Sequence, residues 1–236
     1  MGKIILIGTE HGDLKGSERL ESLLEIVRPD ILSVEFSLES LRLSQDDSAD
    51  ITKIISEAKE RGVSNTFIHL FEDLIAKQGL IDFGYTTSRS YADKHEIPLV
   101  LSDDPRLASA CRVLKLDVLH RMISGLPANI ELPAPSEEEL IRDTDRYYEF
   151  AANVIKGAVP QAQVDRFLES HRGVLIGQRD VHMEQMIRLN YNPISVLVHI
   201  CGFAHLFDDS KRETLYSRIK DLKPQRHLLF YSGSTL

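Results

Sequence analysis

Two short segments of the chain place a histidine three residues after a glycine. Gly8 precedes His11, and Gly202 precedes His205. Each pair follows an apolar run typical of a buried strand, so the glycine lets the backbone turn out of the sheet and the histidine can point back over the strand ends. Two imidazoles and one carboxylate are a common catalytic metal set with positions left for water. We expect Glu35, near the end of another apolar run, to supply the carboxylate.

The predicted cofactor is therefore a divalent cation such as Mn, Zn or Co, held by His11, His205 and Glu35. Glu10 adds an acid directly before the first histidine. It fits a second base, a ligand or a solvent-facing side chain, and we expect the last. A nucleotide site has no specific support, because the glycines and the lysine of the first loop match neither the dinucleotide fingerprint nor the P-loop pattern.

Composition excludes several protein classes. The 236 residues include 28 Lys+Arg and 36 Asp+Glu, a net charge of −8, and 42% are hydrophobic. These values are typical of a folded globular protein and argue against a nucleic-acid partner that binds a basic surface. No apolar run reaches the length of a signal or membrane segment, and the two cysteines lie far apart in the sequence. We expect a cytoplasmic protein without a membrane or nucleic-acid partner; an oligomer is compatible with the sequence.

Strands alternate with helices along the chain. Apolar runs predict strands at 3–7, 31–36, 99–101, 194–201 and 228–231. Capping residues predict helix starts at Ser17, Ser136 (with Glu139), Pro160 and Ser210 (with Glu213). The pattern predicts an α/β fold in which helices flank a mainly parallel central sheet. We expect one domain, 1–236, with a helical insertion at about 120–175 in the second half.

Ligands of such sheets bind at the carboxyl ends of the strands, where three further polar residues are expected. Asp103 and Asp104 follow the predicted strand 99–101 and fit either metal ligands or caps of a helix starting at Pro105; we favour capping. His199 lies inside an apolar strand, which predicts a hydrogen-bonded core histidine.

Four motifs in this order resemble the TraB/Tiki/GumN superfamily, which includes erythromycin-esterase-like and ChaN-like proteins. They are Gly8-Thr9-Glu10-His11, Pro29-Asp30-Ile31-Leu32-Ser33-Val34-Glu35, Arg179-Asp180-x-x-Met183 and Cys201-Gly202-Phe203-Ala204-His205-Leu206. The resemblance spans about 4–207, with no recognisable match at about 120–170. It differs from Tiki-type proteases, which are membrane-anchored, since this sequence shows no anchor.

The resemblance implies an α/β fold with a site formed by His11, Glu35 and His205 at the strand ends. It implies that Arg179 binds a carboxylate or stabilises an oxyanion. It makes a metal-dependent hydrolase of peptide, ester or amide bonds, acting on a small-molecule or peptide substrate, the leading expectation. Two alternatives stay open: a non-catalytic protein that binds a small ligand, a peptide signal or haem, and a metal-independent esterase with His11 as general base.

Overall fold

The fold is given by a computed structural model, which describes residues 2–63, 68, 82–107, 110–111, 113, 117, 120–121, 136–173 and 175–230, with the backbone alone at 44–48. A five-stranded parallel sheet lies at its centre, in the order β3-β2-β6-β1-β7. Its strands are β1 (Lys3–Thr9), β2 (Ile31–Val34), β3 (Leu99–Leu101), β6 (Val196–Gly202) and β7 (Gln225–Leu228). The predicted α/β class with a parallel sheet is confirmed.

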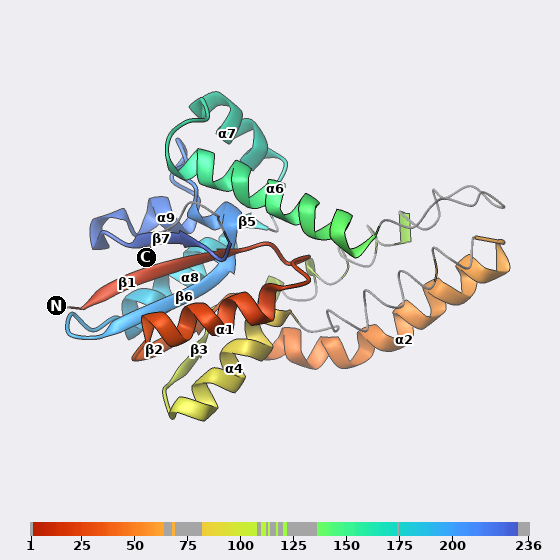
Figure 1. The fold of residues 1–236 in the computed structure, drawn as a ribbon, viewed down its shortest axis with the longest axis horizontal. Helices are drawn as coiled ribbons and strands as arrows, with labels where there is room; N and C mark the ends of the chain where they lie inside the picture. The colour runs from red at the N-terminus through yellow and green to blue at the C-terminus, as the bar shows by residue number, and fades with distance from the viewer. Residues whose placement is uncertain are drawn as a thin grey trace.

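Helices cover both faces of this sheet (Figure 1). They are α1 (Gly16–Val27), α2 (Leu38–Glu60), α4 (Phe83–His95), α6 (Glu137–Ile155), α7 (Gln161–Glu169), α8 (Gln178–Asn190) and α9 (Leu215–Arg218), with short 3-10 turns η1 (Phe203–Leu206) and η2 (Lys220–Leu222). A two-stranded ribbon, β4 (Arg172–Gly173) with β5 (Ile176–Gly177), precedes α8. Figure 1 shows α1 and α4 in front of the sheet, α8 behind it, and α2 extending away from it.

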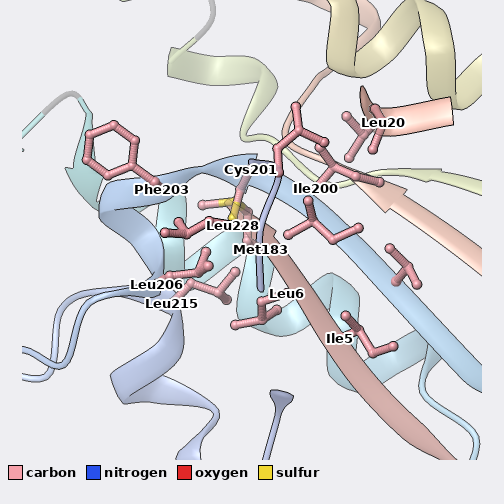
Figure 2. Close-up of a cluster of buried hydrophobic side chains, with 14 of the residues drawn as sticks. Ile5, Leu6, Leu20, Met183, Ile200, Cys201, Phe203, Leu206, Leu215 and Leu228 are labelled. Carbon is pink, nitrogen blue, oxygen red and sulfur yellow. The ribbon is translucent and has the colours of Figure 1, made fainter. Parts of the chain in front are cut away.

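The core lies along strands β1 and β6, because most of their residues are apolar on both faces of the sheet. Ile4, Ile5, Leu6 and Ile7 of β1 are each at most 2% exposed. Figure 2 shows side chains from β1, β6, β7, η1, α8 and α9 packed together in one part of this core. Such near-continuous apolar strands are typical of a parallel sheet covered on both sides, and this rigid core fixes where the strand ends lie.

Local capping chemistry predicts some helix starts correctly. Ser136 and Glu139 form the expected capping box of α6, and α7 starts directly after Pro160. Other starts differ. Helix α1 begins at Gly16 without a side-chain cap from Ser17, and α9 is capped by Thr214, while the Ser210 hydroxyl donates to Asp165 instead.

Two further expectations meet the structure only in part. The last strand is β7, which ends where the predicted strand 228–231 begins. Helices α6 and α7 fall within the range 120–175 assigned to a helical insertion, whereas 122–135, with the prolines and glycine that suggested its boundary, lies outside the described residues.

Candidate functional site

Four neighbouring strands end at one edge of the sheet and deliver the predicted site residues there. The ends of β1 and β6 are paired in register, with Thr9 opposite Gly202, so both glycine–histidine segments leave the sheet side by side. The backbone N–H of Glu35, directly after β2, donates to the carbonyl of Ile200 on β6 at 2.9 Å. Asp103 follows β3 on the far side of β2.

Gly202 lies at the meeting point of the three predicted ligands. A Cβ at this position would lie 3.3 Å from His11 Nε2, 3.6 Å from His205 Cδ2 and 3.7 Å from Glu35 Oε2. The Gly202 N–H also donates to Glu35 Oε2 at 2.7 Å. The φ angle of Gly202 is −56°, which any residue can adopt. The sequence predicts that this glycine serves a sharp turn, but the structure shows that it instead allows the three side chains to approach the backbone closely.

His205 is held between two carboxylates in the buried part of the site. Its Nδ1 donates to Asp180 Oδ1 at 2.7 Å, and its Nε2 lies 3.3 Å from Glu35 Oε1. Burial would lower the pKa of His205, but these two carboxylates outweigh burial and raise the pKa to about 10. The imidazole is only 4% exposed, so its orientation is fixed by these contacts.

Arg179, in the first turn of α8, binds two carboxylates from other elements. Its Nε and Nη2 donate to the two oxygens of Asp103 at 2.7 and 2.8 Å, and Nη2 also lies 2.7 Å from Glu35 Oε1. Burial would raise the pKa of Glu35, yet Arg179 and His205 together hold it well below its usual range. Within the described part of the chain these contacts are made by Nε and Nη2, which leaves Nη1 of the guanidinium for the expected role of meeting a substrate.

His11 lies at the mouth of the site, with a side chain that is 54% exposed. Its Nδ1 contacts Oδ2 of Asp82, the residue immediately before α4. The other oxygen of Asp82 accepts the Gly84 N–H and caps that helix. The contact between His11 and Asp82 is therefore fixed by the start of α4. Nε2 of the His11 ring lies toward Gly202.

Glu10 differs from the solvent-facing side chain we expected. It is half-buried, lines the pocket next to His11, and has a raised pKa because burial disfavours its charge. Its backbone N–H donates to the hydroxyl of Tyr148 at 3.0 Å, and that hydroxyl donates to Asp13 at 3.1 Å. Helix α6 thus fixes the loop that carries both Glu10 and His11.

The remaining sequence candidates divide between the site and the scaffold. Asp104 caps as expected, accepting the Arg106 N–H at 2.9 Å, whereas its neighbour Asp103 belongs to the site through Arg179. His199 is the predicted core histidine: it is fully buried and its Nδ1 lies 3.0 Å from the Ser33 hydroxyl.

Three carboxylates orient the site, and the sequence indicates only part of this role. Asp180 appears in the sequence only as the neighbour of Arg179 in a motif, and Asp103 is expected at a strand end but with capping as its favoured role. For Asp82 the sequence carries no signal, because 71 residues separate it from His11.

These groups surround a pocket of about 210 Å³. Its lining includes the polar residues Thr9, Glu10, His11, Glu35, His171, Arg179 and His205, the apolar residues Phe167, Leu175, Ile176, Phe203 and Ala204, and Gly202. It is smaller than the roughly 300 Å³ at which pockets for drug-sized ligands begin. The pocket therefore has room for a single side-chain-sized group next to the polar cluster.

The residue types of the donor set suit a divalent cation, but their arrangement in this structure does not. His11 and His205 each contact a carboxylate through Nδ1, which is how metal-ligating histidines are usually oriented. Within the described part of the chain, no group of three or more His, Cys, Asp or Glu side chains is arranged to hold a metal ion. Glu35 instead contacts Arg179 and His205 directly.

Comparisons with known proteins assign no family. No protein-family model matches the chain, and no curated protein matches it. Among the described helices, none is both long and apolar enough to cross a membrane.

Proposed function

We propose that the chain is a metal-dependent hydrolase that cleaves an ester, amide or peptide bond at the ends of β1, β2 and β6. The observation that carries this proposal is the convergence around Gly202 of two carboxylate-oriented histidines and one buried glutamate. The sequence resemblance to the TraB/Tiki/GumN group supports the same chemistry. Our proposal includes a cytoplasmic location, on the ground of the low cysteine content.

A divalent cation at this site would be held by His11, His205 and Glu35, and would supply Lewis-acid polarisation of the carbonyl and of water. The chain's own residues divide the remaining work. Nε2 of His11, whose Nδ1 contacts Asp82, would be occupied as a ligand, so the proton acceptor is Glu10, which lines the same pocket. Glu10 takes a proton from water as the water oxygen bonds to the carbonyl carbon. It then gives that proton to the leaving oxygen or nitrogen when the old bond breaks. Arg179 keeps Glu35 ionised and in place.

The test combines metal content with hydrolysis. We expect purified protein to bind Mn, Zn or Co, and to hydrolyse members of a neutral ester and amide panel in a chelator-sensitive way. His11→Ala and His205→Ala should each lower metal affinity or activity by about 10–100-fold or more. His95→Ala is the matched control, because His95 contacts Glu25 on the surface and not the site. The proposal is wrong if both site variants keep the metal content and every activity of the wild type.

A metal-independent hydrolase is the second candidate, and one observation favours it. The Glu35 carboxylate already contacts three groups of the described chain, Arg179, His205 and the Gly202 N–H. His205, held as a cation by Asp180 and Glu35, would then stabilise the developing oxyanion while His11 acts as general base. Activity that survives chelation and is lost in His11→Ala would support this candidate over the first.

A further inference from the structure

The pocket has two chemically different walls, and the apolar one has no part in the proposed hydrolysis. The apolar wall is formed by Phe167, Leu175, Ile176 and Phe203. It lines the same space of about 210 Å³ as the cluster of His11, Glu35 and His205. A substrate whose carbonyl lies at the polar wall must therefore place its neighbouring group against apolar side chains.

This apolar wall is preformed, because its aromatic rings pack on one another. The Phe167 ring stacks on His171 with centroids 4.6 Å apart and lies 6.2 Å from the Phe203 ring. Phe150 and Phe207 support it from behind, at 5.4 and 5.8 Å from Phe167. A rigid aromatic surface of this kind favours flat or branched apolar groups at low entropic cost.

The charges of the pocket oppose an anionic substrate. Arg179 already contacts Asp103 and Glu35, and His205 already contacts Asp180 and Glu35. Glu10 adds a further acid to the lining. In the metal-free protein an anionic group would enter beside two glutamates, and both cations of the lining are already paired with carboxylates, which is costly in a half-buried site.

We propose that the site accepts a neutral ester or amide whose carbonyl carries one aromatic or branched aliphatic group, seated on the wall of Phe167, Leu175, Ile176 and Phe203. This inference rests on the proposed hydrolase function for the position of the carbonyl. It revises the expectation from sequence that Arg179 binds a substrate carboxylate. The volume limits the apolar group to about the size of one side chain.

Binding of three small probes tests the substrate class without requiring turnover. The probes are 3-phenylpropanamide, its anionic analogue 3-phenylpropanoate, and propanamide, which lacks the ring. By calorimetry or NMR titration of the metal-free protein, in which no cation can bind the carboxylate probe, we expect the first to bind at least about tenfold more tightly than either of the others. Equal or tighter binding of 3-phenylpropanoate or propanamide, or no binding of any probe, would overturn the inference.

Variants locate the binding surface. Phe167→Ala should weaken 3-phenylpropanamide binding by about tenfold or more. Because Phe167 belongs to a ring cluster, the half-buried Leu175 gives a second variant: Leu175→Arg should weaken the amide and improve 3-phenylpropanoate by supplying a cation. Tyr147→Ala, on the exposed face of α6, is the control and should bind like the wild type. Unchanged probe binding in both pocket variants would contradict the inference.

Failure of this inference is distinguishable from failure of the proposed function. Probe preference without hydrolysis of any matching ester or amide would retain the binding class and reject the hydrolase. Hydrolysis without preference for aromatic or branched acyl groups would retain the hydrolase and reject the binding class.

Discussion

Asp180 accepts a hydrogen bond from Nδ1 of His205 at 2.7 Å, and thereby turns the other ring nitrogen toward Glu35. The same carboxylate accepts the backbone N–H groups of Leu215 at 2.6 Å and Gly177 at 2.8 Å. It is 0% exposed. One buried carboxylate thus joins the start of α8, the η1 turn and the start of α9, and the orientation of the site histidine depends on it.

Replacing Asp180 should lower the stability of the protein and disturb the orientation of His205. Asp180→Ala removes the partner of a buried imidazole and of two backbone donors, so we expect the free energy of unfolding to fall by about 3–5 kcal/mol. Chemical denaturation measures this. Asp221→Ala is the matched control, because Asp221 pairs with Arg188 at the surface and should cost less than about 1 kcal/mol. Equal losses for the two variants would show that Asp180 has no special role.

Asp82 allows its two functions to be separated. Its carboxylate contacts His11 and caps α4 through the Gly84 N–H. Asp82→Asn keeps a cap oxygen but removes the charge that orients His11, so hydrolytic activity should fall by about 10–100-fold with little change in melting temperature. Asp82→Ala removes both, and should cost about 1 kcal/mol of stability in addition. Full activity in Asp82→Asn would contradict His11 as an oriented base or ligand.

The sequence predicts best what depends on neighbouring residues. Strands β1 and β6 are buried on both faces, so their apolar runs are continuous, and the residues directly after them could be assigned to the sheet edge. Strand β7 lies at the edge of the sheet and is mostly polar, which is why its position was predicted too late in the chain. Asp82 and Asp103 are paired with His11 and Arg179 by tertiary packing alone, and no spacing rule could reveal these contacts.

His199 should make the protein less stable in mild acid. Burial lowers its pKa to about 3, against about 6.5 in an unfolded chain. The unfolded state therefore binds more protons between pH 3 and 6.5, so the free energy of unfolding should fall as the pH falls, by up to about 1.4 kcal/mol per pH unit. His199→Leu should remove the His199 contribution to the dependence of the free energy of unfolding on pH. Urea denaturation between about pH 4.5 and 6.5, within the range in which the unfolded histidine is protonated and the buried one is not, measures this. Ser33→Ala, which removes the hydrogen bond but keeps the imidazole, should retain the slope. Parallel curves for wild type and His199→Leu would refute the assignment.

Gly8 and Gly202, the glycines of the two glycine–histidine segments, should differ in how much stability an alanine substitution costs. A Cβ on Gly8 would lie 2.9 Å from Leu206 Cδ2 and 3.0 Å from the Phe203 Cα, inside the core, so Gly8→Ala should destabilise the fold by about 1–3 kcal/mol. A methyl at Gly202 meets the half-exposed His11 first and has a permitted φ, so Gly202→Ala should change stability by less than about 1 kcal/mol.

The loss of metal affinity and hydrolysis should be larger for Gly202→Ala, the variant with the smaller loss of stability. The Gly202→Ala methyl occupies the point where His11, His205 and Glu35 converge, so metal affinity and hydrolysis should fall by about 100-fold in a protein that still folds. Melting temperatures and metal titrations of the two variants, measured side by side, check both halves of this prediction. A stable, fully active Gly202→Ala protein would mean that the space between these three groups is not where the reaction takes place.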